Sequence, residues 1–323
     1  VVMPGLVDAH VHINEPGRTA WEGFETATKA AASGGITTLV DMPLNCIPVT
    51  TTIDALHQKT VSAREKLWID CGFYGGIIPD NLEDIEPLAE AGVLGFKAFM
   101  SHSGIDEFPK VAESHLRKAL SILANQAIPV LVHAELENGV ETSNSHHTYE
   151  SFQATRPKSW ENNAIKLLIQ LCREYETHIH IVHLSSSDIL PEISQTRDEG
   201  LPLTVETCPH YLHFASERIS DGDTRFKCAP PIWGADNREK LWAGLEKGTI
   251  DFITSDHSPC TPELKQLDTG DFQMAWGGIS SIQFILPVIW TECRQRGFSL
   301  VQLTNWLSKR PAKFIGKDQQ KGQ

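Results

Sequence analysis

Two histidines one residue apart, His10 and His12, stand at the end of the first apolar run of the chain. On a β-strand, residues i and i+2 point to the same face, so both imidazoles can bind one metal ion. Such a pair taken alone consists more often of surface or core histidines than of metal ligands. The pair therefore becomes informative only if other ligands occupy equivalent places later in the chain.

Four further side chains able to bind metal stand late in, or directly after, later apolar runs. They are Lys97, His133, His183 and Asp256. Each of the two histidines alone would be interpreted as a core histidine, and the aspartate as a helix N-cap. The coincidence of four histidines and an aspartate at the ends of such runs favours a metal centre instead.

Lys97 lies in the wholly apolar segment 94–100, where an unpaired ammonium group would be costly to bury. A lowered pKa, a carboxylate partner or chemical conversion of the amine would each remove that cost. A neutral amine reacts with CO2 to give a carbamate, an anionic bidentate group suited to bridging two cations. The alternative is a lysine whose long stem carries the charge out to solvent.

Asp256 is the predicted catalytic residue. Its carboxylate can ligate a metal and accept a proton from a metal-bound water, whose pKa metal binding lowers toward about 7. Once protonated, the same carboxyl group can deliver its proton to a leaving nitrogen.

Short β-branched runs alternate with longer amphipathic stretches and would position these side chains. The runs are 6–12, 37–42, 67–72, 95–100, 129–134, 178–184, 203–206 and 250–255, and the expected helices are 21–33, 53–66, 115–125, 160–175, 237–247, 279–294 and 300–307. This alternation predicts a parallel sheet, and its eight runs fit an α/β fold of the (β/α)8 TIM-barrel type, whose site lies at the C-terminal ends of the strands. An open doubly wound sheet is the alternative, but the first run is not followed by a GxGxxG turn.

Composition narrows the classes of partner. The net charge of −13 argues against nucleic acid and anionic membranes as partners, and no apolar run approaches the length of a membrane span. The seven cysteines show no CxxC spacing, which favours free thiols in a reducing compartment. An intracellular place, in the cytoplasm or an organelle, is therefore expected.

Several phrases resemble the cyclic amidohydrolase branch of the amidohydrolase superfamily, which includes dihydroorotases, hydantoinases or dihydropyrimidinases, and allantoinases. They include GLVDAHVHINEPGR at 5–18, VETCPHYL at 205–212, SDHSPC at 255–260 and AWGGIS at 275–280. Their wording is most similar to that of allantoinases. The resemblance runs from Pro4 to about Gly316.

The resemblance implies a metal-dependent hydrolase that holds two Zn2+ ions per chain. His10 and His12 would bind one ion together with Asp256, while His133 and His183 would bind the other. A carboxylated Lys97 would bridge both ions. A hydroxide shared by the metals would attack a ring carbonyl, which converts allantoin to allantoate in purine (urate) catabolism.

The substrate class rests on Asn14. Dihydroorotases of this type carry an arginine at that place, which pairs with a substrate carboxylate, whereas allantoin is uncharged and suits a neutral hydrogen-bonding side chain. An asparagine in a loop is otherwise a common turn former. By similarity, Ser258, Ala229, Gly277 and Gly278 would also contact the substrate.

Two other functions stay open. One is the ring-opening chemistry of a hydantoinase or dihydropyrimidinase. The other is a catalytically silent scaffold, like relatives that have lost metal ligands, although all six ligand positions are present here. The resemblance also implies a homo-oligomer, in particular a homotetramer.

Two departures from the family pattern concern the loops and the ends of the chain. Trp233 follows Pro230-Pro231-Ile232 where the family has arginine, which puts the local loop structure in doubt. Relatives carry a small β-sandwich built from segments on both sides of the barrel. We therefore expect a barrel over 1–316, a polar tail or a remnant of the β domain over 317–323, and a largely missing flanking domain.

Overall fold

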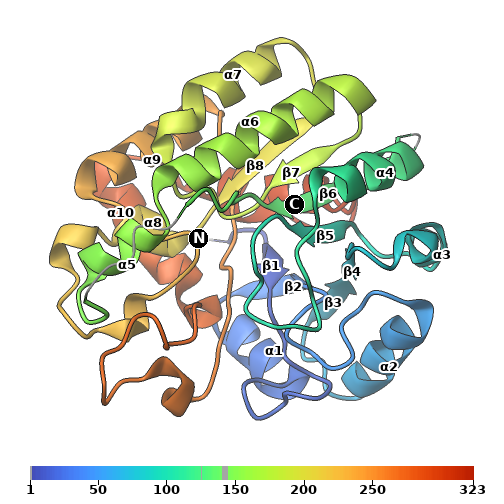
Figure 1. Ribbon diagram of the computed structural model, residues 1–323, viewed down its shortest axis with the longest axis horizontal. Coiled ribbons are helices and arrows are strands. Elements are labelled where there is room, and N and C mark those ends of the chain that lie inside the picture. The colour runs from blue at the N-terminus through green and yellow to red at the C-terminus, as the bar shows by residue number, and fades with distance from the viewer. Residues whose placement is uncertain (1, 125, 140–144) are drawn as a thin grey trace.

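A computed structural model describes residues 2–124, 126–139 and 145–323, with short strands at the centre and helices around them (Figure 1). The strands are β1 (Leu6–Val11), β2 (Ile36–Asp41), β3 (Asp70–Phe73), β4 (Gly75–Gly76), β5 (Phe96–Phe99), β6 (Val130–His133), β7 (Ile179–Ile181), β8 (Leu203–Thr207) and β9 (Phe252–Ile253). They pair in parallel in the orders β1-β2-β3 and β4-β5-β6-β7-β8-β9.

Two joins close these strands into one barrel. Only Tyr74 separates β3 from β4, and its N–H donates to the carbonyl of Asp41 in β2 at 3.0 Å, so β3 and β4 act as one interrupted strand. At the other join, His257 bridges Val11 in parallel and its carbonyl accepts from the N–H of His12 at 2.8 Å. The predicted (β/α)8 barrel is confirmed, and the open sheet is excluded.

Helices cover the outside of the barrel, with α6 and α7 on one side and α1 and α2 on the opposite side (Figure 1). The longer helices are α1 (Phe24–Ser33), α2 (Ile53–Ala63), α4 (Glu113–Leu123), α6 (Lys158–Tyr175), α7 (Leu190–Asp198), α9 (Ala235–Lys247) and α10 (Ile285–Arg296). The shorter ones are α3 (Ile85–Glu90), α5 (Tyr149–Thr155), α8 (Pro209–His213), α11 (Leu300–Thr304) and α12 (Arg310–Phe314).

Helix ends differ from the expected ranges for local reasons. The helix expected over 53–66 ends at Ala63, because Glu65 adopts a left-handed backbone with φ of 63°. The helix expected over 279–294 begins only at Ile285 and ends before Gly297, which has a φ of 77°. The expected helix 115–125 is observed as Glu113–Leu123, and residue 125 lies outside the described residues.

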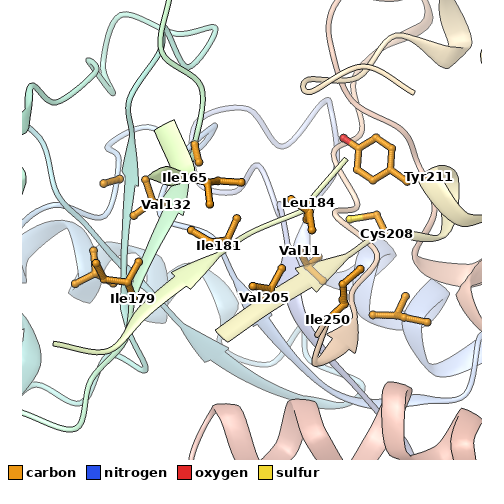
Figure 2. Packing of buried hydrophobic residues seen from close by; sticks show 14 of the residues in the cluster. Val11, Val132, Ile165, Ile179, Ile181, Leu184, Val205, Cys208, Tyr211 and Ile250 are labelled. Carbon is orange, nitrogen blue, oxygen red and sulfur yellow. The ribbon is translucent and has the colours of Figure 1, made fainter. Parts of the chain in front are cut away.

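Strand alternation sorts the side chains of β7 into two sets. Ile179 and Ile181 belong to the buried apolar cluster, and Figure 2 shows Ile181 and Val132 of β6 near Ile165 of α6. His180, between the two isoleucines, is fully buried and points to the opposite face of the strand, which is the barrel interior. The layer between strands and helices is therefore apolar, while the interior carries polar groups.

The end of the chain packs back on the barrel. The N–H of Lys317 donates to the carbonyl of Ala312 at 2.8 Å, and Lys321 forms an ion pair with Asp70, the first residue of β3. The division between a barrel over 1–316 and a tail over 317–323 stays a prediction. Among the described residues, no helix is long and apolar enough to cross a membrane.

Candidate metal centre

The barrel brings all six predicted ligands to the C-terminal ends of its strands. His10 lies in β1, Lys97 in β5 and His133 at the end of β6. His12 directly follows β1, while His183 and Asp256 lie in the loops that follow β7 and β9. All six line one cavity of about 400 Å³: His10, His12, Lys97, His133, His183 and Asp256.

The first half of the centre consists of His10, His12 and Asp256. The carboxylate Oδ1 of Asp256 lies 3.2 Å from His10 Nε2 and 3.4 Å from His12 Nε2. One potential ligand atom from each residue lies within 4.8 Å of the others. The opposite ring nitrogen of His10, Nδ1, lies 2.5 Å from Glu206 Oε1, so the carboxylate fixes the tautomer and leaves Nε2 for a metal.

The second half consists of His133 and His183. His133 Nδ1 lies 3.0 Å from His183 Nε2, so the two nitrogens converge as they would on one ion. His133 Nε2 lies 2.6 Å from Glu135, whose carboxylate also pairs with Arg156. Each half therefore has a glutamate that orients one histidine from behind.

Lys97 lies fully buried between the halves. Its Nζ has no hydrogen-bond partner among the described residues and lies 4.9 Å from the ring of Phe99. Burial lowers the pKa of the amine to about 8, so a sizeable neutral fraction is present near neutral pH. This is the state of the amine that reacts with CO2.

The protonation states of Asp256 and of two histidines, one in each half, suit a bound cation. Burial alone would raise the pKa of Asp256, but the neighbouring His10 and His12 hold it well below its ordinary value. Burial lowers the pKa of His12 to about 4 and that of His183 well below its usual range. Ionised carboxylate and neutral imidazoles are the forms that bind a divalent metal.

Unsatisfied polar atoms supply an independent test of fit. His10 Nε2 and Lys97 Nζ are buried without hydrogen-bond partners among the described residues. Native interiors avoid such groups because each costs free energy. Because these atoms belong to residues that line one cavity, a bound metal pair fits this donor set.

Two residues of the centre adopt uncommon backbone conformations. His183 has a φ of 41° and Asp256 a φ of 43°, both in the left-handed region that non-glycine residues rarely occupy. Each follows its strand and turns its side chain toward the cavity. Local strain of this kind concentrates at functional sites.

A second possible metal cluster shares Asp256 and adds Cys208 and His210. Neither Cys208 nor His210 is among the residues that line the cavity shared by the six predicted ligands. The cluster with His10 and His12 therefore suits a metal better.

The predicted substrate contacts divide into two groups. Ser258, Ala229, Gly277 and Gly278 line the cavity. Asn14 is buried but is not among the residues that line it, and its amide donates to the carbonyl of Pro259 at 3.3 Å. Asn14 thus contacts the loop after Asp256, and its role in substrate binding stays a prediction.

Sequence reasoning missed several groups at the site. Glu206 and Glu135 orient histidines, while Arg156, Lys227 and Trp276 line the cavity. The signal for Glu135 was its place two residues after His133, in the segment that directly follows β6. Trp233, the departure noted above, lies under the Lys158 ammonium at 5.5 Å from its ring.

Comparison with known proteins agrees with this geometry. The Amidohydrolase family profile matches residues 1–323. The chain belongs to the amidohydrolase family. The predicted family is thus confirmed, and with it a hydrolase of a metal-dependent kind.

Within this family the chain is similar to allantoinases. It is 49% identical to the allantoinase of Arabidopsis thaliana over 98% of the chain and 65% of that relative. It is 50% identical to the allantoinase of Streptomyces avermitilis over 98% of the chain and 71% of that relative. The chain therefore spans about two thirds of the length of these relatives.

A solved structure extends the likeness to the fold. The L-hydantoinase (dihydropyrimidinase) of Arthrobacter aurescens superposes with a TM-score of 0.92 at 32% identity, over 99% of this chain and 72% of that chain. This amidohydrolase therefore shares its barrel with the L-hydantoinase, while its sequence is more similar to the two allantoinases.

Proposed function

We propose that this amidohydrolase hydrolyses the hydantoin ring of allantoin to allantoate, a step of purine (urate) catabolism. The observation that carries the proposal is the 49–50% identity to allantoinases, against 32% to the L-hydantoinase whose barrel it shares. The six convergent ligands support hydrolysis rather than a scaffold role.

The proposed centre holds two Zn2+ ions. His10, His12 and Asp256 would hold one ion, His133 and His183 would hold the other, and a carboxylated Lys97 would be a ligand of both. When bound, such a pair polarises the scissile carbonyl and acidifies water. Nitrogen and oxygen ligands of this kind suit Zn2+.

Asp256 acts first as general base and then as general acid. Ionised and beside His10, its carboxylate takes the proton of the attacking water as the new carbon–oxygen bond forms. The carbonyl carbon then loses its bond to the ring nitrogen, and Asp256 returns the proton to that nitrogen. One water is consumed, and the product gains a carboxylate and a free ureido nitrogen.

The cavity wall is suited to a flat, uncharged ring. Any side chain at Gly278 would collide with Ser258, since a Cβ there would lie 2.5 Å from the Ser258 carbonyl oxygen. Glycine at 278 thus allows its backbone to pack directly against Ser258 on this wall of the cavity. Ser258 and the backbone at Ala229 and Gly277 supply hydrogen-bonding groups along the same wall.

The assay uses the purified chain with allantoin, with and without added Zn2+, and follows allantoin loss and allantoate formation by chromatography. Turnover that depends on metal is the expected result. A folded, metal-loaded chain that turns over neither allantoin nor a hydantoin would sink the proposal and favour the scaffold.

Hydantoinase or dihydropyrimidinase chemistry is the second candidate, favoured by the barrel shared with the Arthrobacter enzyme. A panel of allantoin, hydantoin and dihydrouracil separates the two by kcat/KM. Asn14→Arg in the same panel tests whether a carboxylate-binding side chain is tolerated beside a pocket for neutral rings.

Assembly and location complete the proposal. We infer a homotetramer by resemblance, to be tested by light scattering. All seven cysteines are free, which supports an intracellular, reducing compartment.

A further inference from the structure

A chain of hydrogen bonds runs through the barrel interior from the metal centre to the opposite end. It begins at His10, whose Nδ1 lies 2.5 Å from Glu206 Oε1. The other oxygen of Glu206 lies 3.1 Å from His180 Nε2. His180 Nδ1 and His178 Nε2 both lie 2.8 Å from the hydroxyl of Thr204.

Strand register explains why these groups meet. His178 and His180 share one face of β7, and Thr204 and Glu206 share one face of β8, because each pair is two residues apart. His180 pairs directly with Thr204 across the two strands. All four side chains therefore form one polar ladder inside the barrel.

Burial increases along the ladder toward the metal centre. His178 and Thr204 are half-buried and line a second cavity of about 710 Å³ at the N-terminal end of the barrel. His180, Glu206 and His10 are fully buried. The carboxylate of Glu206 thus lies where only protein groups can satisfy it.

The chemistry of the groups decides which atom donates in each hydrogen bond of the ladder. A carboxylate only accepts, so both His10 Nδ1 and His180 Nε2 donate to Glu206. In a neutral ring His180 Nδ1 then accepts, and the Thr204 hydroxyl is its donor. Thr204 therefore fixes the tautomer of His180, which in turn fixes the second oxygen of Glu206.

Glu206 also touches the other half of the centre. Its Oε1 accepts from the backbone N–H of His183 at 3.3 Å, while it holds the ring of His10. One carboxylate therefore sets the places of two predicted ligands on β1 and after β7. Any rotation of this carboxylate would move both.

We propose that His180 is a positioning residue for the metal centre, acting through Glu206 on His10 and His183. This inference rests on the proposed metal centre. His180 is itself held by stacking on Phe252, at 5.3 Å between ring centroids and 7° between planes, and by Phe314 at 4.2 Å. Because the two phenylalanine rings hold His180 in place, its ring can fix the position of the Glu206 carboxylate.

The decisive variant is His180→Phe, which keeps a ring on Phe252 but cannot donate to Glu206. His180→Gln is the rescue variant, because its amide nitrogen can replace the Nε2 donor. His178→Phe is the matched control on the same strand face, without a contact to Glu206. Zn2+ affinity is measured by competition with a chelating dye, and ligand geometry by the absorption spectrum of the Co2+-loaded protein.

We expect His180→Phe to weaken Zn2+ binding on the order of 10-fold and to change the Co2+ spectrum. His180→Gln should recover most of the affinity, and His178→Phe should stay within about 3-fold of wild type. Wild-type affinity and spectrum in folded His180→Phe would overturn the inference alone. A wild-type chain that binds neither metal would overturn the proposed centre as well.

Thr204→Val keeps the test decisive if His180→Phe does not fold. This variant has nearly the same shape but removes the hydroxyl that fixes the His180 tautomer. A weaker Zn2+ affinity with an unchanged circular dichroism spectrum supports the inference, and an unchanged affinity contradicts it.

Discussion

The two halves of the metal centre are anchored in different surroundings. The glutamate behind the first half, Glu206, is fully buried and bonded to His10 and His180 inside the barrel. The glutamate behind the second half, Glu135, pairs with Arg156, whose side chain is 21% exposed and lines the cavity. The barrel interior thus fixes the first half, whereas the second half depends on groups at the cavity rim.

Because one half is held inside the barrel, the fold can keep the candidate metal centre while the residues that contact the substrate change. Burial of Glu206 makes the first half intolerant of change, since an unpaired buried carboxylate would be strongly destabilising. Ser258 lines the same cavity and can change without removing the partner of either buried glutamate.

The largest effect is expected for Asp256→Asn, which removes the charge and the proton acceptor of the first half. We expect kcat to fall roughly 10³-fold, the range typical of a lost general acid–base group. Steady-state kinetics and metal analysis provide the check. Asp251→Asn, at the other end of β9, is the control, and equal losses in both variants would refute the assignment.

Replacing the two anchoring glutamates compares the halves directly. Glu206→Gln should weaken Zn2+ binding about 10- to 100-fold, the range for groups behind metal ligands, and Glu135→Gln should weaken it less. The reason is that Glu206 holds groups of two predicted ligands, His10 and His183, whereas Glu135 holds one, His133. Zn2+ affinity is measured by dye competition, and a greater loss of affinity for Glu135→Gln than for Glu206→Gln would contradict the stronger anchoring of the first half.

The protonation state of Lys97 should make the recovery of activity depend on pH. With its pKa lowered to about 8, the amine is protonated below that pH and neutral above it. At fixed dissolved CO2, the rate at which metal-free protein regains activity should rise about 10-fold per pH unit below 8 and level off above it. Stopped assays after adding Zn2+ measure this rate, and a flat profile would argue for an uncarboxylated lysine.

Ser258→Ala should have the smallest effect. We expect an increase in KM of about 3- to 10-fold for allantoin, which corresponds to one lost hydrogen bond, with metal affinity unchanged. Kinetics on metal-loaded protein test this. If Ser258→Ala also loses metal, Ser258 stabilises the metal centre rather than contacting the substrate ring.

The ligands were predictable because each one ends an apolar run, and parallel strands bring their ends to one rim. His180 was not, because a polar residue inside the run 178–184 shows neither its face nor its partner. Glu206 ends the run 203–206, and its place alone does not distinguish a carboxylate that orients a histidine from a metal ligand. The break at Tyr74 and the left-handed backbone at His183 depend on tertiary contacts, which override local preference. Helices as short as Pro209–His213 contain too few turns to show a period.

The closing seam between Val11 and His257 has a consequence for synthesis. Because His10 emerges from the ribosome long before Asp256, a growing chain displays the first histidine pair without the carboxylate that completes it. The full donor set exists only after the last strand has docked beside the first. A nascent chain stopped anywhere before residue 256 therefore lacks one ligand of the proposed centre, and loading of that centre would report that the whole barrel has been made.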